Sequence, residues 1–166
     1  IDLNGLFHSS TQKIYEYGSH KPNTRLMCNK KPKRIDGLKK QINVFEDICK
    51  NIETLFVLAS PKKRLILCID GPAPVSKQNQ QRQRRFKSAT EKDEDEFNNF
   101  DSNCITPGTK FMDYLSKYID WYIHSRITDD PRWRNIEVIF SNEKSPGEGE
   151  HKIINYIRKY GNPIDS

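Results

Sequence analysis

RLILCID, residues 64–70, is a short apolar run that ends on a carboxylate. Two lysines precede the run, and Gly71 and Pro72 follow it. A short, continuous apolar run between turn residues is typical of a strand that is buried on both faces, as strands of parallel sheets are. The run therefore predicts a parallel sheet in which one strand ends at Asp70.

Helix and strand patterns alternate on both sides of this strand. Apolar residues recur at intervals of three and four over residues 38–56, which predicts a helix that Pro61 ends. A second strand is predicted over residues 136–141, and residues 1–8 have the pattern of a further strand that runs into a turn. This order predicts an α/β fold, one domain over residues 1–166, with a mostly parallel sheet and helices on both faces. In such sheets, ligands bind at the carboxyl ends of the strands.

Three further helices complete the expected order. The first, over residues 76–89, is polar and basic, and the second has Thr106 as its N-cap and Pro107 as its first residue. Residues 132–134 are expected in a loop, and the last helix covers residues 150–160. The apolar residues of this last helix that we expect to face the core are Ile153, Ile154, Ile157 and Tyr160.

The composition favours a polyanionic partner and an intracellular location. Among 166 residues, 28 Lys and Arg exceed 22 Asp and Glu, and the net charge of +6 favours nucleic acid, with a merely basic soluble domain as the alternative. Four widely spaced cysteines form no metal-binding pair, which is typical of free thiols inside a cell. We expect the cytoplasm, with the nucleus as the alternative. No apolar run approaches the ~20 residues that cross a bilayer, so no membrane partner is expected.

Carboxylates stand at three strand ends of the predicted sheet. Asp2 and Asp70 close two strands, and Glu148 and Glu150 follow a third beyond a Pro-Gly turn. Clustered carboxylates repel one another unless a cation holds them, and hard oxygen ligands select Mg²⁺ or Mn²⁺. Two such ions are a common device for phosphodiester cleavage. We therefore predict a metal site, although each aspartate alone can be a turn former and the glutamates can complement a helix dipole.

The helix after Asp70 carries a cationic face. Residues at i, i+4, i+7 and i+8 share one side of a helix, and here they are Lys77, Gln81, Arg84 and Arg85. No acidic residue lies between Asp70 and Ala89 to neutralise this face. Arginine binds phosphate through paired hydrogen bonds and lysine binds it as a point charge, so the face suits a terminal 5′-phosphate beside the metal site. A solvated basic surface is the alternative.

Four strings, in this order, resemble the N-terminal region of the XRN-type 5′→3′ exoribonucleases. They are DLNGLFH at 2–8, CIDGPAPVSKQNQQRQRRFKSA at 68–89, FDSNCITPGTKFM at 100–112 and SPGEGEHKIINYIR at 145–158. The resemblance implies a Rossmann-like core related to PIN-like and flap-endonuclease nucleases. It also implies processive, Mg²⁺-dependent removal of 5′-nucleotides from RNA that bears a 5′-monophosphate, in mRNA decay or RNA processing.

The resemblance further implies roles for single residues. The metal-site acids of the family match Asp2, Asp70, Glu148 and Glu150, and its 5′-phosphate pocket matches Lys77, Gln81, Arg84 and Arg85. His8 matches a residue that holds and moves the terminal nucleotide, and Asn4 lies beside it.

The family carries further acids beyond the point where this chain stops. We therefore expect a fragment, truncated at both ends, that lacks some of the ligands for the two ions of the full-length protein. The alternatives are a flap-type DNA nuclease and a non-catalytic RNA-binding or scaffold domain derived from a nuclease.

Overall fold

The computed structural model describes residues 1–20, 37–90 and 100–161. The predicted central strand is present as β1, Arg64–Cys68, and it pairs in parallel with β2, Glu137–Ser141, with Cys68 opposite Ser141. The third expected strand is reduced to one parallel bridge between Asp2 and Cys68. All three segments run in the same direction, so their carboxyl ends meet at one edge of the small sheet.

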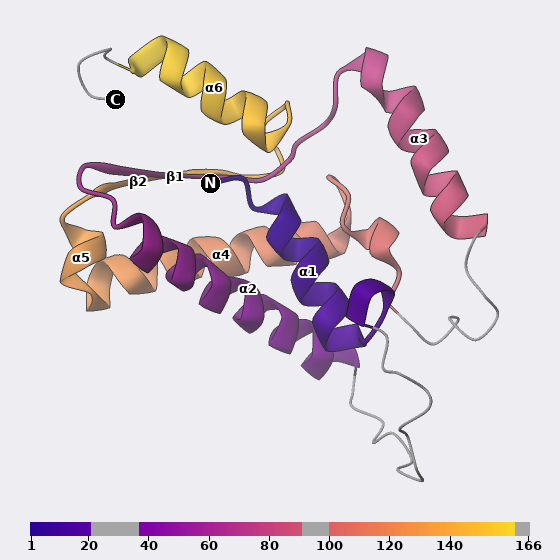
Figure 1. The fold of residues 1–166 in the computed structure, drawn as a ribbon, viewed down its shortest axis with the longest axis horizontal. Helices are drawn as coiled ribbons and strands as arrows, with labels where there is room; N and C mark the ends of the chain where they lie inside the picture. Colours follow the sequence, from indigo (N-terminus) through magenta and orange to yellow (C-terminus); the bar gives the residue numbers. More distant parts are fainter. Residues whose placement is uncertain (21–36, 91–99, 162–166) are drawn as a thin grey trace, which may run out of the picture.

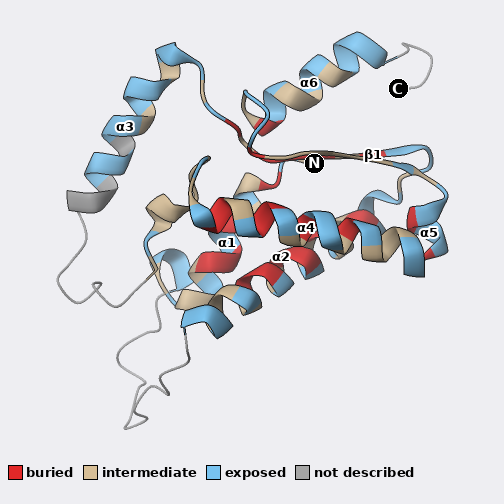
Figure 2. Cartoon of the chain, turned by 180° about the vertical axis from the view of Figure 1, so that it is seen from behind, coloured by how far each residue is buried: buried red, intermediate tan, exposed pale blue. Residues whose placement is uncertain are grey.

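One face of the sheet is covered by α1 (Asn4–Tyr15), α2 (Gly37–Ala59), α4 (Lys110–Asp129) and α5 (Pro131–Arg134), as Figure 1 shows. Buried residues gather where α1, α2 and α4 face the sheet and one another (Figure 2). Side chains at helical spacing on α2 meet those of α4 and β1 in this core, which includes Val44, Ile48, Ile52, Leu65, Leu67, Leu115 and Ile119. The predicted helix thus lies where expected, and it ends before Ser60, at φ 44°, and Pro61.

The opposite face carries α6, Gly149–Tyr160, which contacts β1, whereas α3, Val75–Thr90, projects away from the sheet (Figure 1). Helices therefore lie on both faces of a parallel sheet, as predicted, but the described residues are mostly helical and their sheet is small. None of the described helices is long and apolar enough to cross a membrane.

The expected inward face of α6 is wrong for three residues. Ile153 is half-buried, but the side chains of Ile154, Ile157 and Tyr160 are 44 to 57% exposed. The first turns of α6 pack on the sheet edge, whereas helical periodicity alone cannot tell which apolar residues find a partner.

Two local predictions between residues 100 and 135 are also wrong. The N-cap of α4 is Thr109 instead of Thr106, and its Oγ1 accepts a hydrogen bond from the Met112 amide at 3.3 Å. The helix begins later than predicted because Gly108, at φ +89°, has a backbone conformation that does not continue a helix. Trp133 does not lie in an open loop: the one-turn helix α5 buries it completely, stacked on Phe56 with ring centroids 4.4 Å apart. Two short 3₁₀ turns complete the described part of the fold. One, η4, covers Ser102–Cys104 and precedes α4, and the other, η1, covers Gly18–His20 and follows α1.

Candidate active site

The site forms around Gly149, the first residue of α6. The Gly149 amide donates to Asp70 Oδ1 at 2.6 Å, because the first amides of a helix have no partner within it. A Cβ at this position would lie 2.5 Å from Asp2 Oδ1, so only glycine lets the Asp2 carboxylate lie this close to the helix. The structure thus brings Asp2 and Asp70 together from two different strand ends.

Asn4, in the first turn of α1, holds Asp2 in place. Its backbone amide and its side-chain Nδ2 both lie 3.2 Å from Asp2 Oδ1, to which they donate. The family resemblance places Asn4 beside the terminal nucleotide, and the structure shows it bound to the carboxylate of Asp2 and lining the adjacent pocket.

Glu148 and Glu150 lie on either side of Gly149, and the structure adds His151 to them. His151 Nδ1 lies 3.2 Å from Glu148 Oε2 and 3.9 Å from Glu150 Oε1, and ligand atoms of the three residues lie within 4.8 Å of one another. The Glu148 side chain is 14% exposed and that of Glu150 is 68% exposed. No pattern in the sequence assigns His151 a role, and its place directly after Glu150 is the one signal that points to it.

Lys77 links α3 to this acidic group. Its Nζ lies 2.7 Å from Glu148 Oε1 and donates to Oε2 at 2.8 Å. The hydrogen bond and charge of Lys77 hold the pKa of Glu148 below its ordinary value, and Glu148 raises the pKa of Lys77 in turn. Glu148 is therefore an ionised carboxylate with a cation beside it.

Asp70 has the opposite electrostatics. Burial raises its pKa, and the charges of Asp2 and Glu148 raise it further, while the bond from Gly149 acts the other way. Burial and the neighbouring carboxylates thus make the ionised form of Asp70 costly, and a bound divalent cation would offset that cost. The candidate metal ligands are carboxylate oxygens, with the imidazole of His151 beside two of them. Such oxygen ligands fit Mg²⁺ or Mn²⁺. Asp2, Asp70, Glu148 and Glu150 are the side chains that would hold it.

Lys152, which the sequence analysis also missed, fixes the two strand ends beneath the acids. From α6 its Nζ donates to the carbonyl of Ile69 at 2.7 Å and to that of Asn142 at 2.8 Å. Burial lowers its pKa. The residue ties the end of β1 to the segment after β2 and so sets the spacing of the acids that follow each strand.

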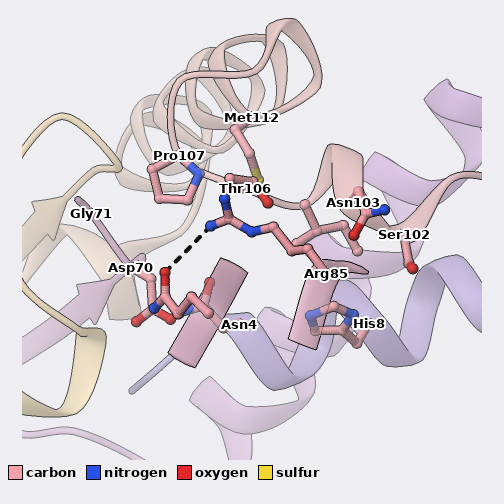
Figure 3. A pocket seen from close by; sticks show the side chains of 12 residues that line it. Asn4, His8, Asp70, Gly71, Arg85, Ser102, Asn103, Thr106, Pro107 and Met112 are labelled. Carbon is pink, nitrogen blue, oxygen red and sulfur yellow. Dashed lines mark hydrogen bonds between the residues drawn. The ribbon is translucent and has the colours of Figure 1, made fainter. Parts of the chain in front are cut away.

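A pocket of about 360 Å³ opens beside Asp70. Figure 3 shows that Arg85 crosses it, with Asp70 and Asn4 on one side and His8 farther along α1. Arg85 Nη2 donates to Gln81 Oε1 at 3.3 Å. The predicted helix face is therefore divided, because Gln81 and Arg85 line the pocket whereas Lys77 points to Glu148. The side chain of Arg84 lies outside the described part of the chain.

Few side chains of α3 are buried. Among its described side chains, only Lys77 and Gln81 are half-buried, and the others, Arg85 included, are exposed. A helix with so few buried residues is oriented by the contacts that those two make. His8, to which the family resemblance gives a role at the terminal nucleotide, lines the same pocket as Arg85.

Comparison with known proteins gives a family. The chain matches the family described as XRN 5'-3' exonuclease N-terminus over residues 1–165. It is 40% identical over 169 residues to 5'-3' exoribonuclease 1 of Schizosaccharomyces pombe, covering 95% of this chain and 11% of that protein. It is 38% identical over 190 residues to the 5'-3' exoribonuclease 2 homolog of Caenorhabditis briggsae, covering 98% and 17%.

The 5'-3' exoribonuclease 1 of Saccharomyces cerevisiae is similar at 38% identity over 170 residues, which cover 95% of this chain and 10% of the yeast protein. The chain thus spans less than a fifth of the length of these curated relatives. The resemblance drawn from the four strings is confirmed over nearly the whole chain. Because the match runs from residue 1 to 165 and the relatives are about two-fifths identical, the chain belongs to the XRN 5'-3' exonuclease family, of which it carries the N-terminal region.

Proposed function

We propose that the full-length protein is a metal-dependent 5′→3′ exoribonuclease and that this chain supplies part of its metal site and the pocket for the 5′-phosphate. One observation carries the proposal: carboxylates from three strand ends converge on Gly149, directly beside a pocket that Arg85 crosses. The relatives named as 5'-3' exoribonucleases support the same activity.

The chemistry fits hydrolysis of the first phosphodiester bond. Water attacks the phosphorus between the first two nucleotides and the P–O3′ bond breaks, which releases a 5′-nucleotide with a free 3′-hydroxyl. Divalent ions at such a site supply an activated water and stabilise the leaving oxygen. The shortened RNA again begins with a 5′-monophosphate, so the same pocket can bind the new end, and this favours processive action.

In this proposal some residues of the chain bind the metal and others bind the phosphate. The four acids Asp2, Asp70, Glu148 and Glu150 would hold the cation. Asn4 orients Asp2. Arg85 offers a guanidinium to the 5′-phosphate, and Gln81 fixes that guanidinium. Lys77 lies between the two groups and can contact a phosphate oxygen or Glu148.

The finer fold and location are also proposals. A parallel sheet between helices supports a Rossmann-like, PIN-type core in the full-length domain. Among the residues that the structure describes, the thiols of Cys49 and Cys68 are free, which supports an intracellular protein, with the cytoplasm preferred to the nucleus.

The test follows degradation of one RNA sequence by the full-length protein. The RNA bears a 5′-monophosphate, a 5′-hydroxyl or a cap, and each is incubated with Mg²⁺ and with EDTA. We expect only the monophosphate RNA to be degraded, only with Mg²⁺, and nucleotides to be released without intermediates. Equal cutting of all three RNAs would refute the phosphate pocket and favour a flap-type or endonucleolytic enzyme, and salt-sensitive binding without cutting would favour a scaffold domain.

A matched pair of variants locates the phosphate pocket. Arg85→Met is expected to lower kcat/KM on monophosphate RNA by about 10- to 100-fold, the size of one lost charged hydrogen-bonding contact. Arg82→Met removes the same charge from an exposed position on the same helix outside the pocket, and it should retain activity. Equal losses in both variants would mean that α3 acts only through its overall charge.

A further inference from the structure

The wall of the pocket that faces α3 carries neutral polar groups. The η4 turn contributes Ser102 and Asn103 to the lining, and Figure 3 shows both on the side of His8, away from Asp70. The pocket therefore has a charged end, formed by Asp70 and the Arg85 guanidinium, and an opposite end where the uncharged side chains of Ser102 and Asn103 lie with His8.

The η4 turn is held firmly by bonds that leave these two side chains free. Asp101 Oδ1 accepts from the Asn103 amide at 3.2 Å, and the Thr109 hydroxyl donates to the Cys104 carbonyl at 2.6 Å. Phe100, just before the turn, stacks on Tyr15 with ring centroids 4.6 Å apart. Ser102 and Asn103 are half-buried, and in the described part of the chain neither side chain has a hydrogen-bond partner.

Half-buried polar groups on a rigid turn are suited to a ligand, because they lose little entropy when they bind one. A hydroxyl and a carboxamide each donate and accept, and they carry no charge. They match a ribose hydroxyl, which also donates and accepts, better than they match a phosphate. Ribose adjoins the phosphate in every nucleotide, so a 5′-phosphate at Arg85 brings a sugar to a neighbouring part of the pocket.

We propose that Ser102 and Asn103 hydrogen-bond the ribose 2′-hydroxyl at the 5′ end of the substrate and thereby favour RNA over DNA. The inference rests on the proposed function, because the phosphate at Arg85 sets the position of the sugar. It divides recognition between two elements: α3 binds the phosphate and η4 binds the sugar.

The experiment uses the full-length protein and two RNAs that carry a 5′-monophosphate and differ only in a 2′-hydroxyl or 2′-deoxy group in their first two nucleotides. The rate of release of these nucleotides is measured in single turnovers. The wild-type protein is expected to prefer the ribose end. Asn103→Ala and Ser102→Ala should each reduce this preference by about fivefold, the effect of one net hydrogen bond, by slowing the ribose end alone.

Two controls separate recognition from structure. Asn155→Ala removes an exposed carboxamide from α6 outside the pocket and should leave the preference unchanged, and Ser102→Thr, which keeps the hydroxyl, should restore much of it. Equal slowing of the ribose and deoxyribose ends by Asn103→Ala, or a wild-type protein without any preference, would overturn the inference. If Asn103→Ala instead changes rates according to the identity of the first base, η4 contacts the base, and the proposal is also wrong.

The same assay distinguishes this failure from failure of the proposed function. A protein that degrades monophosphate RNA only with Mg²⁺, but shows no coupling between η4 and the 2′-hydroxyl, contradicts the inference alone. A protein that degrades neither RNA with Mg²⁺ contradicts the proposed function itself.

Discussion

The variant Gly149→Ala tests whether metal binding can be weakened without a loss of folding stability. The added Cβ would lie 2.5 Å from Asp2 Oδ1 and 2.9 Å from its Cγ, whereas carbon atoms in contact are ordinarily about 3.5–4.0 Å apart. The carboxylate must therefore withdraw by about 1 Å. The group that must move is a side chain, so the backbone of α6 can remain in place.

The expected effect on stability is small. Gly149 is not among the glycines with positive φ, and it is the first residue of a helix. At such a position, replacing glycine by alanine raises the free energy of unfolding by about 1 kcal/mol or less. Against this gain stand the two hydrogen bonds from Asn4 to Asp2, which weaken when the carboxylate moves. We expect the melting temperature to change little.

The expected effect on metal binding is large. A displacement of about 1 Å at a catalytic group can cost about 100-fold in rate, and we expect at least a tenfold weaker metal affinity. Isothermal titration with Mn²⁺ measures affinity directly, and the Mg²⁺ concentration for half-maximal RNA degradation measures it through activity. Unchanged metal affinity in a folded Gly149→Ala protein would refute the view that Asp2 contributes a ligand through this close approach.

Gly71→Ala is the matched contrast. A Cβ there would lie 1.7 Å from the backbone oxygen of Ser145, which cannot move without displacing the loop that leads to α6. This variant should lose stability as well as metal binding, measured as a lower melting temperature. An equal loss of melting temperature in both glycine variants would contradict this reasoning, which expects the side-chain contact at Gly149 to cost less stability than the backbone contact at Gly71.

Three further variants test contacts around the site and far from it. Lys152→Met removes two charged hydrogen bonds that tie the strand ends and should reduce the free energy of unfolding by about 2 kcal/mol in denaturant titrations; no reduction would contradict that role. Lys77→Met removes the cation beside Glu148, so the pH below which Mn²⁺ dissociates should rise; an unchanged pH profile would mean that Lys77 does not set the ionisation of this acid. Asp130 has its pKa lowered from 3.8 to about 2, chiefly by a hydrogen bond from Arg132. Its ionised form therefore stabilises the fold above pH ~4, and this contribution is lost as the pH falls through about 2, so Asp130→Asn should lower the melting temperature much more at pH 6 than at pH 2. An equal decrease at both pH values would contradict the assignment.

The predicted strand at residues 64–70 and the acids at three strand ends needed only local information. Alternation of apolar runs with helical periodicity fixes the order of the elements, and parallel strands bring their carboxyl ends to one edge. Asp2 and Asp70 meet there as expected. The cationic residues of α3 were also visible, because helical spacing alone decides which residues share a face.

The contacts that the cationic face of α3 makes could not be predicted from the sequence. Lys77 and Arg85 lie two turns apart on α3, yet Lys77 pairs with Glu148 and Arg85 crosses the pocket. The direction in which α3 leaves the sheet sets this difference, and no periodicity encodes it. For the same reason, three of the four apolar residues assigned to the inner side of α6 are exposed, and Trp133, assigned to a loop, is fully buried.

The amino-acid sequence by itself determined the family, the order of strands and helices, and the kinds of side chain available to hold a cation and a phosphate. Only the tertiary structure decided which of them act together: Asn4 on Asp2, His151 beside Glu148, and Lys152 across two strand ends. The physical reason is that propensity and periodicity act over a few residues of one chain segment. Contacts such as those of Gly149 with Asp2 and Asp70 depend on distances between segments up to 147 positions apart, which packing of the whole core sets.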